Sequence, residues 1–337
     1  MSYDAKPIFF NEPAYSTPQI KTAMLTFLKR WLPKHSSTVE LKLYHYTTLE
    51  GLRGILNSRS IWFTHTSTLN DPLELKYGKQ LILDILNEVT NNENEGNIKN
   101  LLRFLSDTVN GFTIMTNQTY VACFCESENL LSQWRSYAAQ GGGYNLGLRF
   151  QSNTKFYHAL DDTEEDSYVI LRKMVYDVEE QRGLILDYIS SIVTSSGDAI
   201  KYFNEHGGIP DAWASIAAME SVNILFDLML SFKNPVFNEE NEWRLIKGRQ
   251  ASYKPEHLKF RETNEGLIPY IETYIVEDLE GKFVFPLCSI KFGPMLDDER
   301  SKSTLELFVN KEAVSENKIS INVNDVRITG AGYILRK

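Results

Sequence analysis

The sequence has few cysteines and lacks the segments that mark secreted or membrane proteins. Its 337 residues include three cysteines, and two of these, Cys123 and Cys125, stand one residue apart in a segment rich in strand-forming residues. On a strand such neighbours share a face but are poorly placed for a disulfide. The first residues contain neither a basic region nor a long apolar region, and no run of about 18 apolar residues occurs. We therefore expect reduced thiols, a cytoplasmic protein and no membrane span.

Positive charge is also scarce. The chain has 35 lysines and arginines against 44 acidic residues, a net charge of -9. This balance excludes a basic surface over the whole protein and argues mildly against a nucleic-acid target. It is still compatible with a local cleft lined by basic residues. The chain also lacks GxGxxG after a strand, GxxxxGK[ST], HExxH, GxSxG and zinc-type pairs of cysteines. The common dinucleotide, nucleotide, zinc-protease and esterase motifs are therefore absent.

Hydrophobic residues make up 42% of the chain, which is enough for one large core or two modest ones. Segments of strand composition alternate with helical patterns, so we predict an α+β fold with a mixed, mostly antiparallel sheet. Residues 1–40 are expected to form an N-terminal helical extension, whose helix ends at Pro33. Residues 41–337 are expected to form a single α+β domain with helical insertions at about 79–117 and 178–232.

The segment 41–72 predicts strand, helix, strand and turn. Residues 41–46 alternate like a strand, and Thr47 or Thr48 can cap the helix that follows. Other expected strands lie in 119–126, 144–150, 166–177, 237–248 and the tail after 267, and other expected helices in 129–140, 212–232 and 301–311. Residues 90–97 are expected to form a polar loop between two helices. The glycines 141–143 end the helix that starts at 129, and they form either a loose loop or a close approach to a ligand.

Four clusters carry residues that could perform chemistry. His45 ends the first strand, although a lone histidine on a strand is usually structural. Asn70, Asp71 and Pro72 read most simply as a turn. Residues 132–137 place Trp134 and Tyr137 on one helix face, an arrangement typical of a core. Residues 238–244 place Glu242 and Arg244 on the same side of a strand, which on its own indicates a surface ion pair.

A metal site is a further alternative, built on some of these residues and on others near them in the sequence. His45, His65, Asp71 and Glu74 contain suitable ligand atoms, but their spacing matches no known ligand pattern. We therefore expect no metal, and a metal-dependent nuclease built on His45, Asp71 and Glu74 is the weakest of the functional hypotheses.

Taken together, the segments LYHYT, IWFT, LNDP, CFC, SxWRxYA, ExEWR and KFGP resemble a large family of uncharacterised bacterial domains, often found near mobile elements and defence genes. The resemblance extends from about Leu43 to the C-terminus. The pattern in turn is similar to the His–Tyr–Glu branch of the ADP-ribosyltransferase superfamily. The segments that match this branch are 45–47, 54–56, 61–63, 132–138 and 241–243, and Tyr46 departs from it because poly-ADP-ribosylating members have glycine there.

This resemblance implies NAD as the substrate and no metal. Cleavage of the nicotinamide–ribose bond passes through an oxocarbenium-like state that needs a nearby carboxylate. Glu242 would stabilise that state, His45 would hold a ribose, and Tyr137 would stack on nicotinamide. Further NAD-binding candidates are Tyr46, Thr47, Asn70, Ser132, Arg135 and Arg244, with either arginine able to pair with the pyrophosphate.

The resemblance thus predicts an enzyme that transfers ADP-ribose from NAD to a macromolecular acceptor, a protein or a nucleic acid, or to water. A toxin or antiviral-defence effector is the expected context, in the cytoplasm and away from membranes. The alternative is a catalytically inactive module that binds a nucleotide or a partner. The two differ in one observable, which is the release of nicotinamide from NAD.

Overall fold

A computed structural model describes residues 40–69, 73–111, 119–157, 169–208, 211–247, 257–263 and 266–333, with Thr22, Thr26 and Phe27. The described residues divide into two compact units. A helical unit contains those within 1–36, 67–118 and 173–239, and a sheet unit contains those within 37–66, 119–172 and 240–337. The expected N-terminal helix, apart from those three residues, lies outside the described part of the chain.

The sheet unit is built on twelve strands, mostly antiparallel, as the strand patterns predict. Its main path runs β10-β9-β2-β3-β1-β4-β11-β12, and β7 pairs with β3 while β5 and β8 pair with β9 and β6 pairs with β7. The strands are β1 (Leu41–Thr47), β2 (Ser60–His65), β3 (Tyr120–Cys125), β4 (Tyr144–Phe150), β5 (Thr154–Tyr157), β6 (Val169–Lys173), β7 (Glu242–Lys247), β8 (Leu258–Thr263), β9 (Gly266–Leu279), β10 (Lys282–Val284), β11 (Leu287–Phe292) and β12 (Arg327–Gly330).

Strand β3 is shared by two branches of the sheet. On one side it pairs along its whole length with β7. On the other side its start pairs with β2, at Val121 opposite Thr64, and its end pairs with β1, at Cys125 opposite Tyr44. Because β1 and β2 both run antiparallel to β3, they separate from one another between these two points. The sheet is therefore split at the middle of β3.

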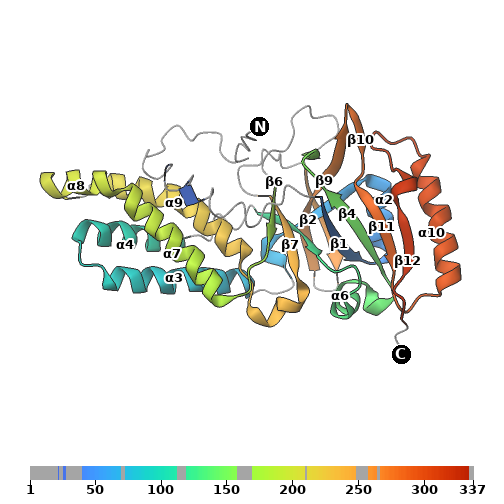
Figure 1. Cartoon of the computed structure of the whole chain (residues 1–337), viewed down its shortest axis with the longest axis horizontal. Helices are drawn as coiled ribbons and strands as arrows, with labels where there is room; N and C mark the ends of the chain where they lie inside the picture. The colour runs from blue at the N-terminus through green and yellow to red at the C-terminus, as the bar shows by residue number, and fades with distance from the viewer. Residues whose placement is uncertain are drawn as a thin grey trace. The chain divides into compact units, whose positions relative to one another are not determined.

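One face of the sheet carries the main hydrophobic core. Leu43, Phe124 and Trp243, on neighbouring strands, are among its buried residues. Two helices cover this face, α2 (Leu49–Ser58) through Leu52, Ile55 and Leu56, and α10 (Asp298–Ala313) through Leu305 and Val309. Figure 1 shows α10 beside β11 and β12. We call this the core face.

The other face, here the α6 face, carries a smaller cluster under α6 (Leu131–Tyr137). Tyr46 and Cys125 lie in this cluster, while Leu43 and Phe124, which are an odd number of residues away on the same strands, lie in the main core. This division follows from the alternation of side chains along a strand. The two faces therefore separate the even-numbered from the odd-numbered side chains of β1.

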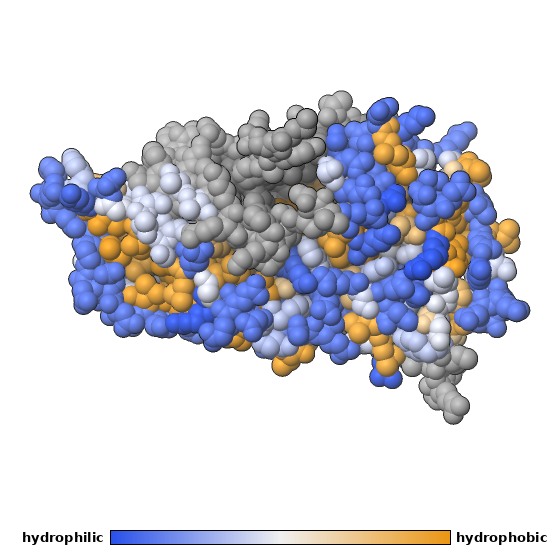
Figure 2. Space-filling model, viewed as in Figure 1, coloured by the Kyte–Doolittle hydropathy of each residue, from blue (hydrophilic) through white to orange (hydrophobic). Residues whose placement is uncertain are grey.

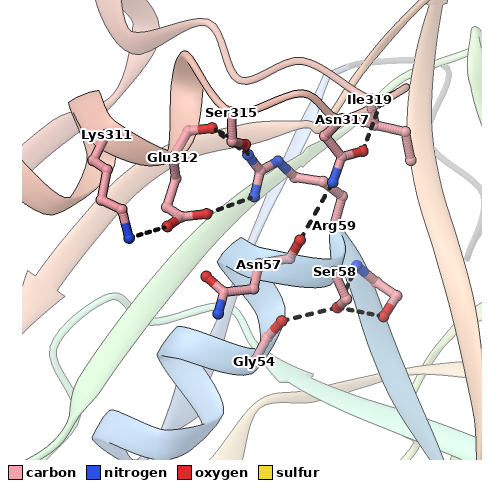
Figure 3. Close-up of polar contacts among 10 residues, drawn as sticks. Gly54, Asn57, Ser58, Arg59, Lys311, Glu312, Ser315, Asn317 and Ile319 are labelled. Carbon is pink, nitrogen blue, oxygen red and sulfur yellow. Dashed lines mark hydrogen bonds and ion pairs between the residues drawn. The ribbon is translucent and has the colours of Figure 1, made fainter.

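A buried arginine joins the ends of the two helices on the core face (Figure 3). Arg59 caps α2 in a left-handed conformation, with φ of 59°. Its Nη2 donates to the main-chain oxygen of Glu312 at 2.6 Å and to Oγ of Ser315 at 3.3 Å. Asn317 Nδ2 also donates to the Asn57 carbonyl. Thus the end of α2 is fixed to the end of α10, more than 250 residues later in the chain.

The helical unit is formed by two insertions into the sheet unit. The first carries α3 (Glu74–Asn92) and α4 (Gly96–Asn110), and the second carries α7 (Val178–Ser195), α8 (Gly197–His206) and α9 (Asp211–Ser231). Figure 1 shows α3, α4, α7 and α9 side by side, and Figure 2 shows hydrophobic side chains gathered over them. These insertions pack against one another and so make a compact unit of their own.

Two expectations about the helices need correction. The predicted loop 90–97 shrinks to 93–95, because α3 continues to Asn92 and the Glu95 carboxylate caps α4. The second insertion has three helices where two were expected. Of these, α9 is long and apolar enough to cross a membrane by length and composition, over Trp213–Ser231, but most of this stretch is buried inside the protein. It therefore has the burial of a core helix.

Candidate functional site

Three strands bring the predicted site segments together. His45 lies on β1, α6 follows β3, and Glu242 begins β7. Strand β3 pairs with both β1 and β7, with Cys125 opposite Tyr44 on one side and opposite Glu242 on the other. Segments almost 200 residues apart in the chain therefore meet on adjacent strands.

Glu242 and Arg244 form a buried ion pair on the α6 face. Arg244 Nε donates to Glu242 Oε1 at 2.6 Å, and Nη2 donates to Oε2 at 3.0 Å. The residues are only 5% and 2% exposed. The sequence predicted the pairing correctly, but its placement on the surface was wrong. A bidentate pair with so little exposure fixes the carboxylate in one orientation.

Strand β3 supplies the thiol next to this pair. Cys125 is paired with Glu242 in the ladder and is 2% exposed. Burial raises the pKa of Cys125 to about 11, and the carboxylates of Glu126, Glu240 and Glu242 add to the rise. The thiol is therefore protonated at neutral pH and is no nucleophile there. All three cysteines are free, as expected from their spacing.

His45 lies at the split in the sheet and on the opposite face from Glu242. Because Tyr44, Cys125 and Glu242 are opposite one another, their side chains share a face, and His45 points the other way. Its ring lies 5.6 Å from that of Phe124, and Nδ1 is 2.9 Å from the Cys123 carbonyl oxygen. Burial lowers the pKa of His45, and the positive charge of Arg261 lowers it further, against the effect of the Cys123 bond.

Tyr46 and its neighbours hold α6 in place. The Tyr46 hydroxyl donates to the Ser127 carbonyl at 2.9 Å and accepts from the Leu130 amide at 2.8 Å. Its ring packs edge-on against Trp134, with ring centroids 4.9 Å apart. Trp134 is fully buried, as its spacing predicted, and its Nε1 donates to Asn129. Tyr46 therefore has a structural role, which is to fix the start of α6 to β1.

The remaining predicted residues of α6 differ in exposure. Tyr137 is half-buried and packs against the small cluster on the α6 face. Ser132 is also half-buried, and Arg135 is exposed and lies near Tyr333, whose pKa it lowers against the larger effect of burial. Arg135 thus points away from the face that carries Trp134, as its helical spacing predicted.

The glycines after α6 approach other parts of the backbone. A Cβ on Gly143 would lie 2.4 Å from the Thr47 carbonyl oxygen, and one on Gly293 would lie 2.2 Å from that of Gly141. The Gly293 amide donates to Gly143, and the Met295 amide donates to Gly141. The run is therefore neither a loose loop nor a gap for a ligand. It is the contact between the KFGP segment and the end of α6.

Thr47 has a similar steric role at the start of α2. Thr48, and not Thr47, caps the helix by accepting from the Gly51 amide. A Cβ on Gly51 would lie 2.0 Å from Oγ1 of Thr47. The threonine hydroxyl therefore occupies the space that this glycine leaves.

The predicted metal alternative rests in part on Asp71, which is not among the described residues. Asn70, Asp71 and Pro72 lie outside them, so the expected roles of Asn70 and Asp71 stay predictions. Glu74 lies in the helical unit with its Oε2 3.9 Å from Lys233 Nζ, and His65 lies in the sheet unit beside Tyr120. Among the described residues, no group of three metal-ligating side chains occurs.

Two features, a buried lysine and a hollow, were missed by the sequence interpretation. Lys247, at the end of β7, is 1% exposed, and burial lowers its pKa to about 7. A hollow of about 420 Å³ lies on the α6 face, lined by Lys42, Tyr44, Arg149, Cys288, Ser289, Asp325 and Arg327. These residues come from distant segments, so only the strand register brings them together.

Residues 133–245 match the profile of a family described as "Protein of unknown function (DUF2971)". The matched segment runs from α6 to β7, and so includes Tyr137 and the Glu242–Arg244 pair but not His45. No curated protein and no solved structure matches the chain. The predicted resemblance to an uncharacterised-domain family is therefore supported over this segment.

Proposed function

We propose that the chain is an ADP-ribosyltransferase-like enzyme that cleaves NAD at the α6 face, beside Glu242. The observation that carries this proposal is the meeting of the three motif segments on β1, β3 with its following helix, and β7. Among these segments, β7 carries the buried carboxylate of Glu242. This residue has the same place in the order of motifs along the chain as the catalytic glutamate of the resembled branch.

In the proposed reaction the bond between nicotinamide and C1′ of its ribose breaks, and the bonding electrons leave with nicotinamide. A lone pair of a macromolecular acceptor or of water then bonds to C1′, and the acceptor loses its proton. Glu242 accepts a hydrogen bond from the ribose and stabilises the positive charge that develops on it. Each carboxylate oxygen has a second lone pair, so the Arg244 pair does not prevent this.

The other residues bind and position. Tyr137 provides an aromatic face beside the cluster that contains Cys125, and it stacks on nicotinamide. Arg244 holds Glu242 in orientation. His45 acts as a positioning residue, because its ring bonds the carbonyl of Cys123, and Cys123 pairs with Arg244 on β7. In this proposal His45 keeps β3 in register and does not itself contact the ribose.

The test is incubation with NAD and measurement of free nicotinamide, followed by a search for mass shifts on candidate acceptors. Glu242→Gln should abolish nicotinamide release while the protein stays folded. The matched control is Glu312→Gln, which alters another buried carboxylate that lies beside an arginine, on the core face. Unchanged NAD consumption in Glu242→Gln, or its loss in both variants, would contradict the proposal.

The pair geometry also favours a second candidate, an inactive module that binds a nucleotide or a partner. Both carboxylate oxygens of Glu242 already accept hydrogen bonds from Arg244, which is sufficient for a purely structural pair. Saturable NAD binding without nicotinamide release would identify this second function.

A further inference from the structure

The hollow lies on the same face of the sheet as Glu242. Glu242 is on β7, on one side of β3, and the hollow lies over β1, β4, β11 and β12, on the other side. Consecutive strand pairings place one row of residues directly opposite one another across six strands. Directly paired residues share a face, so these side chains all stand on the α6 face. The row is Glu242, Cys125, Tyr44, Gly147, Ser289 and Arg327.

A glycine, Gly147, lies between two residues that line the hollow, Tyr44 and Ser289. A Cβ on Gly147 would lie 2.2 Å from Oγ of Ser289 and 3.1 Å from a ring carbon of Tyr44. The missing side chain lets Tyr44 and Ser289 meet over the backbone of β4. The hollow has a volume of about 420 Å³, which is within the size of small-molecule sites.

The lining is rich in hydrogen-bond donors. Arg149 uses Nε and Nη2 to bind Glu277 at 2.8 and 3.1 Å, which fixes the guanidinium and leaves Nη1 uncommitted among the described residues. Within the same part of the chain the Tyr44 hydroxyl has no hydrogen-bond partner, and burial raises its pKa, so it stays protonated. Only Asp325 contributes a carboxylate to the lining.

The lining contains three cations and one carboxylate, and that carboxylate, Asp325, has its Oδ2 3.8 Å from Nη2 of Arg149. Lys42 forms an ion pair with Glu40, and Arg327 forms one with Glu128, but both pairs are exposed to solvent. Exposed pairs contribute little, so their cations can turn to a ligand. A planar carboxylate ligand would prefer the two-pronged edge of a guanidinium, and Glu277 already occupies that edge of Arg149. A tetrahedral anion suits single donors that arrive from several strands.

We infer that this hollow binds a phosphate group, held by Lys42, Arg149 and Arg327 with the hydroxyls of Tyr44 and Ser289. The phosphate is either free or part of a nucleotide. This inference does not depend on NAD cleavage at Glu242.

The test is calorimetric titration of the full chain with inorganic phosphate and with AMP, against chloride at equal ionic strength. We expect saturable binding of at least one. The double variant Lys42→Gln/Arg327→Gln should weaken it at least tenfold. Tyr44→Phe should weaken it several-fold without a change in melting temperature, because it removes only an unbonded hydroxyl.

The matched control is Lys311→Gln, which removes one exposed charge from α10 outside the hollow and should change affinity less than twofold. Tighter binding of AMP identifies a nucleotide as the source of the phosphate, and equal binding identifies free phosphate. Absence of saturable binding of both, or an equal loss in Lys311→Gln and in the double variant, overturns the inference. Glu242→Gln should retain phosphate binding, which separates this result from the test of NAD cleavage.

Discussion

Glu242 and Arg244 stand two residues apart on β7, share two hydrogen bonds of 2.6 and 3.0 Å, and are both almost completely buried. Removal of Arg244 leaves the Glu242 carboxylate buried without its bidentate partner. We expect Arg244→Ala to lower the free energy of unfolding by about 3–5 kcal/mol. Chemical denaturation of this variant measures the change.

Replacing both members tests whether the pair is retained for stability. The double variant Glu242→Met/Arg244→Leu should recover much of the stability lost in Arg244→Ala, because it leaves no charge behind. If the pair serves catalysis, the double variant is as stable as the wild type or nearly so, yet releases no nicotinamide. A double variant that is less stable than Arg244→Ala would contradict this account.

Lys247 makes stability depend on pH in a defined window. Burial lowers its pKa to about 7, below the 10.5 of an exposed lysine, so the unfolded chain binds more protons between these values. Stability should therefore rise as pH increases from about 7 to about 10. At pH 7 and below, the buried charge imposes its full cost.

Lys247→Met should remove this slope and raise the free energy of unfolding at pH 7 by a few kcal/mol, since one pKa unit corresponds to about 1.4 kcal/mol. The check is urea denaturation of both proteins at pH 7 and pH 9.5. Lys311→Met serves as a control because Lys311 is exposed. An identical slope in the wild type and in Lys247→Met would exclude Lys247 as its source.

Arg59 combines an unfavourable backbone conformation with a buried side chain. Both Arg59→Ala and Arg59→Gly lose the bonds to Glu312 and Ser315 and should be destabilised. At a φ of 59° glycine is less strained than alanine, so Arg59→Gly should be the more stable variant by about 1 kcal/mol. Thermal unfolding compares the two, and the reverse order would show that strain at this cap is negligible.

Tyr46 fixes α6 through its hydroxyl. Tyr46→Phe removes one donor and one acceptor and should lower the free energy of unfolding by about 1–3 kcal/mol, because the Ser127 carbonyl and the Leu130 amide lose a partner. Hydrogen exchange at the Leu130 amide should become faster. Tyr202→Phe, at an exposed tyrosine of α8, is the control and should change neither quantity.

Local sequence patterns predicted the elements that depend on neighbouring residues. Strand β4 and the start of α2 were predicted closely, because alternation and a capping threonine specify them within a few residues. The bidentate bond between Glu242 and Arg244 was predicted as an ion pair for the same reason, since strand spacing alone puts the two on one side.

Register between distant strands could not be predicted in this way. His45 and Glu242 lie on opposite faces of the sheet because of the register in which β1 and β7 pair with β3. A shift of one strand by one residue would place the two side chains on the same face. The hollow beside Tyr44 has the same origin. The partner of the glycine run, the segment around Gly293, was likewise invisible because it lies about 150 residues later.

The two insertions have a consequence for the order in which the protein forms during synthesis. Strand β3 pairs along its whole length with β7, yet β7 emerges more than a hundred residues later, after α7, α8 and α9. Until then one edge of β3, with the apolar sequence YVACFC, has no partner from its own sheet. Because long-range strand pairing is slow and exposed edges promote association, the nascent chain passes through a stage at which aggregation competes with completion of the sheet.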